Sequence, residues 1–309
     1  MNDNSIAVTV LMIRPTYFGA NAETAASNRF QRLTAHGMDV REAAKAEFDT
    51  VVQVLREAGI AVAVFEDTPE PQKPDAVFPN NWVSFHEDGT VCLYPMQAQN
   101  RRLERRRDIL QTLQDERGYH ITTIEDWSDK EREDRYLEGT GSLVLDRANR
   151  LAYACLSSRT DARLARAWCR HFNYQPVLFH ATDSNGAAIY HTNVMMCIGD
   201  RFAVVCLDCI PDHAERETVT SQLQESGHRI VPISMQQMAQ FAGNMLLLRN
   251  DKGEPILVMS SRAEQSLADQ QHSELRQFAR IVSSPLDTIE DCAGGSMRCM
   301  IAELFLLRT

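Results

Sequence analysis

The feature that most constrains the fold is a recurring pair of apolar, β-rich runs that flank a polar turn. Such pairs predict β-hairpins. The sequence contains NWVSF–HEDG–TVCLYPM, SLVLD–RANR–LAYAC, VMMCI–GDR–FAVVCL and MLLLR–NDKG–EPILVMS. A repeat of roughly 50 residues is typical of radial or stacked arrays of one supersecondary unit. We therefore expect a chain built from copies of one small unit, with an ordinary mixed α/β domain as the alternative.

Each predicted hairpin is followed by a segment with helical spacing and then by another short apolar run. These segments and runs are Arg101–Glu116 with Tyr119–Ile124, Ala162–Phe172 with Pro176–Phe179, His213–Glu225 with Arg229–Ile233, and Arg262–Arg280 with the weaker Ile281–Ser283. A further unit is divided between the chain ends: Ala7–Arg14, Arg41–Ala58, Ile60–Phe65 and Cys299–Leu307. The pattern predicts five ββαβ-like units in one closed ring.

Composition narrows the class of protein. The 309 residues are 44% hydrophobic and carry a formal net charge of −10. This charge disfavours nucleic acid and acidic membranes as partners, because no basic surface offsets phosphate repulsion. No apolar run is long enough to span a membrane, and the N-terminal residues lack a signal-peptide pattern. Eight irregularly spaced cysteines are typical of reduced thiols, so we predict a cytoplasmic protein.

Polar or nucleophilic residues directly precede the first strand of each predicted unit. They are Asp75, Asn80 and Asn81, then Glu138, then His191 and Asn193, then Asn244, and finally Cys299. A ring of similar units would point all of them at one central cavity. A cysteine, a histidine and a carboxylate are what thiol nucleophilic catalysis requires. Taken singly, each has a structural explanation: a buried core cysteine, a hydrogen-bonded core histidine and a surface acid before a turn.

Short motifs extend over most of the chain. They are PDAVFPNN at Pro74–Asn81, NRRLE at Asn100–Glu104, LEGTGS at Leu137–Ser142, LSSRT at Leu156–Thr160, YHTN at Tyr190–Asn193 and GGSMRCM at Gly294–Met300. With these motifs the chain resembles the guanidine-modifying superfamily of amidinotransferases, arginine deiminases and dimethylargininases. The resemblance implies the pentein fold, a five-bladed α/β propeller, as a single catalytic domain over residues 1–309 that is closed by the N- and C-terminal strands.

The resemblance also implies roles for individual residues. Cys299 is then the nucleophile, His191 the general acid and base, and Glu138 the carboxylate of the triad. Asp75 is implied to bind substrate. Arginines at two motif positions are implied to hold the amino-acid carboxylate, which suits a planar, permanently charged guanidinium. The predicted substrate-binding residues are Asp75, Asn81, Asn193, Arg101, Arg159 and Asn244.

Two positions depart from the deiminase pattern. Deiminases of this superfamily usually grip the guanidinium with two aspartates, where this chain has Asn81 and Asn193. A ureido group is neutral and offers an acceptor oxygen beside N–H donors, so amides match it without burying unpaired charge. The RPxxFxxNxET segment at Arg14–Thr24 also resembles a bacterial citrulline-hydrolase family. We therefore predict hydrolysis of citrulline to ornithine, carbon dioxide and ammonia through a covalent Cys299 intermediate.

Two alternatives stay open. One is an arginine or methylarginine deiminase of the dimethylargininase type, in which the asparagines are tolerated. The other is a non-catalytic binding protein like the ribosome-associated factor that shares this fold, although such a protein needs no Cys–His–Glu triad. The expected partner is a small amino-acid substrate, and the sequence leaves the oligomeric state open, with a homodimer as one option.

Other signals predict less. Cys206 and Cys209 form a lone C-x-x-C, which without a second ligand pair favours the end of a buried strand over a zinc site. GTGS in LEGTGS is too short for a dinucleotide loop. We therefore predict no metal and no cofactor. The polar stretch Tyr17–Gly37 is either an active-site lid, with Phe18, Asn21 and Glu23 as its notable residues, or a surface loop.

Overall fold

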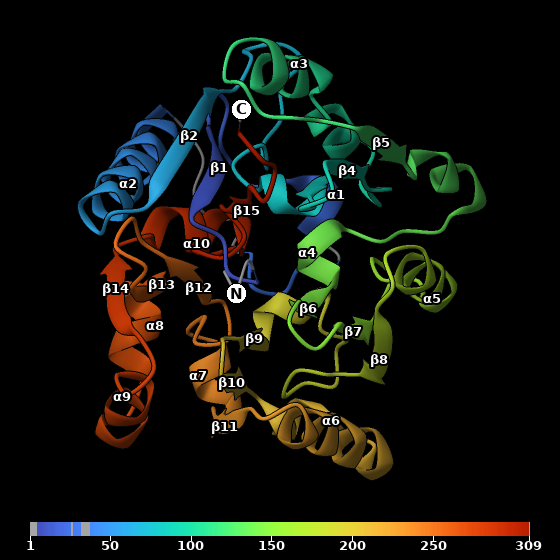
Figure 1. Cartoon of the computed structure of the whole chain (residues 1–309), viewed down its shortest axis with the longest axis vertical. Coiled ribbons are helices and arrows are strands. Elements are labelled where there is room, and N and C mark those ends of the chain that lie inside the picture. Colours follow the sequence, from blue (N-terminus) through green and yellow to red (C-terminus); the bar gives the residue numbers. More distant parts are fainter. Residues whose placement is uncertain (1–4, 26, 32–37, 309) are drawn as a thin grey trace.

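Three-stranded sheets surround a central axis, and helices cover the outside of the ring (Figure 1). The computed structural model describes residues 5–25, 27–31 and 38–308. In each of the five sheets the inner strand runs antiparallel to the middle strand, and the outer strand runs parallel to the middle one. This arrangement confirms the predicted five-bladed α/β propeller of pseudo-symmetric ββαβ units, the pentein fold.

The blades follow the chain in order around the ring. From inner to outer strand they are β15 (Ala302–Glu303), β1 (Thr9–Arg14) and β2 (Ala61–Glu66); β3 (Val83–Phe85), β4 (Thr90–Leu93) and β5 (Thr123–Asp126); β6 (Val144–Asp146), β7 (Leu151–Leu156) and β8 (Gln175–His180); β9 (Met196–Ile198), β10 (Phe202–Val205) and β11 (Arg229–Pro232); β12 (Leu246–Arg249), β13 (Pro255–Ser260) and β14 (Arg280–Ser284).

Helices connect the strands and cap the blades. The α-helices are α1 (Ala22–Ala25), α2 (Met38–Glu57), α3 (Arg107–Asp115), α4 (Gly139–Ser142), α5 (Ala162–His171), α6 (His213–Glu225), α7 (Met235–Met238), α8 (Ser261–Ser266), α9 (Asp269–Leu275) and α10 (Asp287–Ala293). The 3₁₀ helices are η1 (Pro79–Asn81), η2 (Asn100–Glu104), η3 (Ser128–Glu133), η4 (Thr192–Val194) and η5 (Leu207–Cys209).

The first blade joins the two ends of the chain. β1 pairs with β15, so that Val10 faces Glu303, and with β2, so that Thr9 faces Ala61. The expected division of one unit between the termini is therefore present, although its C-terminal strand is only two residues long. That residues 1–309 form a single catalytic domain stays a prediction.

The middle strands are apolar in their interiors, and their polar residues, such as Thr9 and Arg14 of β1, lie at strand ends. β4 and β10 are buried at every residue. Tyr153 of β7, Val204 of β10 and Leu257 of β13 belong to one buried cluster, which joins three blades. This packing explains why the sequence shows no boundary between the repeats. Among the described helices, none combines the length and apolar character needed to cross a membrane.

Two of the expected helices are interrupted. The expected helix Arg262–Arg280 is divided into α8 and α9, because Leu267 and Ala268 are extended and Gln271 Oε1 accepts a hydrogen bond from the Ala268 N–H. The expected helix Arg101–Glu116 is divided into η2 and α3 at Arg105–Arg106, since Arg105 leaves the helical conformation to reach the Tyr94 carbonyl. The first break carries a local capping hydrogen bond and the second a contact with a residue distant in the sequence, and apolar periodicity reports neither.

One expected strand is displaced. Apolar spacing placed it at Tyr119–Ile124, whereas β5 runs from Thr123 to Asp126. Tyr119 is instead buried and forms an isolated bridge with Arg308. Its apolar character therefore reflects packing near the C-terminus and not membership of the blade.

Candidate active site

Residues that precede the inner strands come together at one end of the propeller axis. Glu138 and His191 are the N-cap residues of α4 and η4, and α4 contacts both η1 and η4. Asn244 Nδ2 and Asn193 Nδ2 lie 3.3 and 3.4 Å from Cys299 Sγ. The structure thus brings these distant residues together, as the repeat pattern predicts, while their catalytic and binding roles stay predictions.

Two glycines of the LEGTGS motif allow this close approach. A Cβ at Gly139, whose φ is +50°, would lie 2.2 Å from the Asn80 carbonyl oxygen. A Cβ at Gly141 would lie 2.4 Å from Asn81 Nδ2 and 2.8 Å from His191 Nδ1. The glycines of LEGTGS therefore let the Asn81 side-chain amide and the His191 imidazole pack against the backbone of this motif.

The Cys299 thiol is buried at the start of β15. Its loop is fixed from both sides, because the Asn244 side-chain oxygen accepts a hydrogen bond from the Arg298 N–H and Gly295 packs on the ring of Phe78. The two amide N–H groups that point at the sulfur, from Asn193 and Asn244, favour negative charge there. Such donors can stabilise a thiolate without placing a positive charge beside it.

His191 and Glu138 form a buried pair with 2.8 Å between His191 Nε2 and a Glu138 oxygen. Burial lowers the pKa of His191 to about 4, although Glu138 acts in the opposite direction. Burial also opposes ionisation of Glu138, but Arg159 and the hydrogen bond with His191 outweigh it and lower the Glu138 pKa to about 2. At neutral pH the pair is therefore a carboxylate and a neutral imidazole, which can accept a thiol proton.

Arg101 lies among carboxylates beneath this pair. It donates two hydrogen bonds of 2.9 Å to Glu104 and one of 2.9 Å to Asn81 Oδ1, and it lies 3.6 Å from Asp75. Burial opposes the charge of Arg101, but Glu104 and Asp75 outweigh it and raise the Arg101 pKa. Because its guanidinium is already held in this way, the positive charge of Arg101 offsets negative charge of the surrounding carboxylates.

Arg159 connects the His191–Glu138 pair to the N-terminal segment. It lies 3.6 Å from Glu138 and donates hydrogen bonds to Ser27 Oγ and to the Thr24 carbonyl. Its guanidinium also stacks 4.9 Å from the centre of the Tyr190 ring, a favourable cation–π contact. We call Asp75, Arg101, Glu104, Glu138 and Arg159 the charged wall.

The N-terminal segment covers the site. Asn21 Nδ2 donates to Asp75 at 2.7 Å, and Asn28 Nδ2 donates to the Ala293 carbonyl at 2.8 Å. Phe18 is buried, and Glu23 accepts a hydrogen bond from the Asn100 N–H. The described part of the expected lid Tyr17–Gly37 therefore lies over the cavity, while residue 26 and residues 32–37 fall outside the described residues.

The front cavity, as we call the space between these groups, has a volume of about 260 Å³, counting the solvent at its mouth. It is lined by Asn28, Asp75, Phe78, Asn81, Arg101, Arg159, Tyr190, His191, Ala293, Gly295 and Cys299. We call Asn81, Asn193 and Asn244 the amide wall: Asn81 lines the cavity and accepts a hydrogen bond from Arg101, while Asn193 and Asn244 lie against the sulfur of Cys299. Asn81 Nδ2 and Asn193 Oδ1 are buried, and neither has a hydrogen-bond partner among the described residues. One donor and one acceptor are therefore free near the thiol.

Metal-ligating side chains are dispersed in the described part of the chain. Within the described ranges, no group of three or more His, Cys, Asp or Glu side chains is arranged to hold a metal ion. Cys206 and Cys209 are both buried at the end of β10, with their sulfurs 2.9 Å apart and Met238 Sδ 3.2 Å from Cys209. This location agrees with the end of a buried strand.

Glu104 and Gly141 are the site residues that sequence reasoning missed. RRLERRR suggests a solvated helical face, yet Arg101 and Glu104 are both buried. The three-residue spacing between them was the available signal, because it allows a pair within one helical turn. Burial raises the pKa of Glu104 to about 7, so this carboxyl group titrates near neutral pH.

The sequence also matches a known family over most of its length. The profile described as N,N dimethylarginine dimethylhydrolase, eukaryotic, matches residues 14–306. The chain belongs to this family. As a member of the N,N dimethylarginine dimethylhydrolase family, it is a hydrolase of guanidino or ureido carbon–nitrogen bonds in the guanidine-modifying superfamily. A comparison with curated proteins finds no significant match.

Solved structures resemble this dimethylhydrolase family member in fold. Apo ArgZ, an arginine dihydrolase from the ornithine–ammonia cycle in cyanobacteria, aligns with a TM-score of 0.73 and 16% identity over 95% of this chain. The chain spans 40% of that protein's length. A substrate-bound cysteine-to-serine mutant of the ArgZ N-terminal domain aligns over 96% of this chain and 99% of that domain, with a TM-score of 0.73 and 16% identity.

The dimethylhydrolase from Pseudomonas aeruginosa, as a cysteine-to-serine mutant complexed with citrulline, aligns over 97% of this chain and 100% of its own length. The TM-score is 0.64 and the identity is 13%. At these identities the likeness shows a common fold and leaves the substrate of this family member undecided.

Proposed function

We propose that the chain hydrolyses citrulline, or a close ureido analogue, to ornithine, carbon dioxide and ammonia. The observation that carries this proposal is the division of the front cavity. The carboxylates Asp75, Glu104 and Glu138 each lie within ion-pair distance of Arg101, while the groups beside Cys299 are neutral amides. A cationic guanidinium would find no unpaired carboxylate on either wall.

The free atoms of the amide wall complement a ureido group. The unpartnered Asn193 oxygen can accept from a ureido N–H, and the unpartnered Asn81 amide can donate to the ureido oxygen. A guanidinium has donors only, so it would leave the Asn81 amide without a partner inside a buried cavity, at a cost of about 1–3 kcal/mol.

The proposed reaction has two steps. His191 accepts the Cys299 proton, the sulfur bonds to the ureido carbon, and the bond from that carbon to the side-chain nitrogen breaks as His191 protonates the departing amine. This leaves a carbamoyl thioester and ornithine. Water then bonds to the same carbon with His191 as base, the carbon–sulfur bond breaks, the thiol regains its proton, and carbamic acid decomposes to ammonia and carbon dioxide.

A second candidate is favoured by the comparisons. The family match and the arginine- and citrulline-bound relatives favour hydrolysis of arginine or methylated arginine over citrulline hydrolysis. The same thiol, imidazole and carboxylate would then attack a guanidino carbon, and Asp75 would be the carboxylate nearest to the cation. In this candidate the asparagines of the amide wall are tolerated substitutions.

Product analysis separates the two candidates. Purified protein is incubated in turn with citrulline, arginine, asymmetric dimethylarginine and agmatine, and amino-acid products are quantified. We expect ornithine from citrulline alone. Release of citrulline from arginine or dimethylarginine faster than consumption of citrulline would replace the proposal with the second candidate.

A double variant, Asn81→Asp with Asn193→Asp, tests the amide wall directly. We expect kcat/KM for citrulline to fall by about 10- to 100-fold and kcat/KM for arginine to rise, because two carboxylates would then face the scissile carbon. Asn185→Asp makes the same chemical change in an exposed turn and should change neither value. An unchanged preference in the double variant would contradict the role of the amides.

A further inference from the structure

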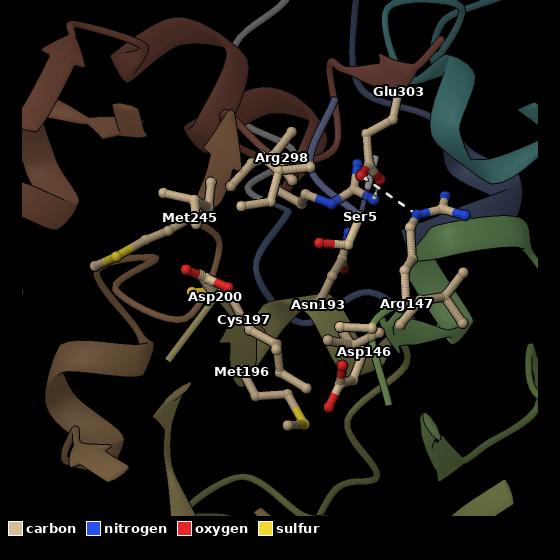
Figure 2. A pocket seen from close by; sticks show the side chains of 18 residues that line it. Ser5, Asp146, Arg147, Asn193, Met196, Cys197, Asp200, Met245, Arg298 and Glu303 are labelled. Carbon is tan, nitrogen blue, oxygen red and sulfur yellow. Dashed lines mark hydrogen bonds and ion pairs between the residues drawn. The ribbon is translucent and has the colours of Figure 1, made fainter. Parts of the chain in front are cut away.

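A second, larger cavity lies at the other end of the propeller axis (Figure 2). It encloses about 660 Å³, counting the solvent at its mouth. Its walls come from Ser5 and Ile6, from β6, β9 and β12, and from Arg298 and Glu303. Asp146 and Asp200, at and just beyond the ends of β6 and β9, also line it, whereas the catalytic residues precede those strands. We call it the rear cavity.

Asn193 stands between the two cavities. Its Nδ2 lies 3.4 Å from the sulfur of Cys299, which lines the front cavity, and Asn193 itself lines the rear cavity (Figure 2). The buried Asn193 Oδ1 has no protein partner within the described part of the chain. Until a ureido N–H of the substrate takes this oxygen, it is a favourable position for a water molecule. One side chain therefore separates the thiol from the rear cavity.

The front route is closed by contrast. The hydrogen bonds from Asn21 to Asp75 and from Asn28 to the Ala293 carbonyl hold the N-terminal segment over the front cavity. An amino acid bound beneath this segment would itself fill the path to the thiol. Water must nevertheless reach the thioester, and small products must leave it.

We propose that the rear cavity is a passage for small neutral molecules, which brings water to the thioester on Cys299 and lets ammonia and carbon dioxide leave, with Asn193 as its gate. This inference rests on the proposed function. The charged lining of Arg147, Arg298 and Glu303 suits water. The ion pairs of Glu303 with Arg298 at 2.8 Å and with Arg147 at 3.8 Å narrow the passage, which suits small molecules better than amino acids.

The chemistry of the second step makes such a passage useful. Water supplies the oxygen that bonds to the carbamoyl carbon, and carbamic acid then yields ammonia and carbon dioxide. Neither the water nor these products needs the charged wall. A rear route would allow water to reach the thioester, and ammonia and carbon dioxide to leave, while the amine product still occupies the front cavity.

Narrowing the rear cavity tests the proposal. Val144 and Ile198 are partly buried residues that line it and lie outside the catalytic and substrate-binding groups. We expect Val144→Trp, and separately Ile198→Trp, to lower kcat by at least about fivefold with KM for the amino acid unchanged or lowered, because hydrolysis of the thioester becomes limiting. Acid quenching during turnover, followed by intact-protein mass spectrometry, should show more carbamoyl-Cys299 than in wild type.

Val282→Trp is the matched control, since Val282 is a partly buried valine of the outer strand β14 that packs on another cluster. It should leave kcat and the adduct level as in wild type. The proposed passage is contradicted if both cavity variants fold, as judged by thermal melting, and keep wild-type kcat. It is also contradicted if Val282→Trp lowers kcat as much as the cavity variants do. A wild-type protein that turns over no ureido or guanidino substrate removes the proposed function and the passage together.

Discussion

The two walls of the front cavity satisfy their polar groups in different ways. On the charged wall, Arg101 and Arg159 lie within ion-pair distance of the carboxylates, and Arg101 alone contacts three of them. On the amide wall, Asn81 and Asn193 each keep one buried polar atom without a described partner. The charged wall is complete without a ligand, whereas the amide wall needs one. Arg159 thus keeps Glu138 ionised while burial keeps His191 neutral, and in the proposed function the neutral amides recognise the substrate.

Removing the nucleophile should have the largest effect. Cys299→Ala should lower kcat by at least about 10³-fold, because no other group can carry the covalent intermediate. Cys169→Ala removes a thiol that is equally buried in α5, away from both walls, and should keep wild-type turnover. Steady-state assays and melting curves of the two variants give the result. Comparable turnover in Cys299→Ala and wild type would exclude covalent catalysis by this thiol.

The next largest effect on kcat is expected at Glu138, the residue of the charged wall that contacts the His191 imidazole. Glu138→Gln should lower kcat by about 100-fold or more, because an amide cannot stabilise the imidazolium that forms when His191 accepts the thiol proton. Glu138 raises the pKa of His191 against the larger effect of burial. The acidic fall of kcat/KM, expected near pH 4 in wild type, should therefore move to lower pH in the variant.

A pH profile of kcat/KM for Glu138→Gln and Glu138→Asp tests this interpretation. The aspartate keeps the charge and should restore part of the activity and the position of the acidic limb. If both variants lost activity equally and their limbs stayed near pH 4, Glu138 would act only through the fold.

A substitution at Gly141 should displace Asn81 of the amide wall or the neighbouring His191, with a smaller effect on activity. In Gly141→Ala the new methyl group would lie 2.4 Å from Asn81 Nδ2 and 2.8 Å from His191 Nδ1, so one of them must move. We expect kcat/KM to fall by about tenfold and the free energy of unfolding to fall by about 1–3 kcal/mol. Gly19→Ala, where no atom lies within 4 Å of the added carbon, is the control. Unchanged kinetics in Gly141→Ala would mean that the amide and the imidazole tolerate displacement.

The sequence predicted the amide wall better than the charged wall. The hairpin repeat placed Asn81, Asn193, Asn244 and Cys299 at the starts of inner strands, and the ring brings strand starts together. Position in the repeat was therefore sufficient to predict their proximity. The same reasoning predicted five blades, because each hairpin carries its own turn signal.

Glu104 shows why the rest could not be predicted. It lies in a run of arginines on a segment that periodicity assigns to a continuous helix, and only the break at Arg105–Arg106 separates η2 from α3. At that break the Arg105 guanidinium donates a hydrogen bond to the carbonyl of Tyr94, which follows β4 and is a partner that the local pattern does not reveal. The pairing of Arg101 with Glu104 likewise needs the burial of both side chains, which follows from packing between blades.

Titration of Glu104 should produce the smallest effect. It changes the charge of the charged wall, without any substitution, while the amide wall stays neutral. Because burial raises the Glu104 pKa from its ordinary value of 4.5 to about 7, its contribution to stability is fully present below pH 4.5 and is lost as the pH rises through 7. Ionised Glu104 also adds a negative charge to the charged wall. The ratio of kcat/KM for arginine to that for citrulline should therefore rise by about twofold to fivefold between pH 6 and pH 8.

Glu104→Gln should flatten both the stability profile and this ratio. Glu290→Gln is a matched control, because burial also raises the pKa of Glu290 to about 7. Glu290 bonds to Ser296 and pairs with Arg262, whereas Glu104 bonds to Arg101, which lines the front cavity. The control variant should flatten the stability profile and leave the pH dependence of the substrate ratio intact. A ratio that changes equally in both variants would show that ionisation at the charged wall does not reach the substrate, and that the amide wall alone sets the preference for a neutral group.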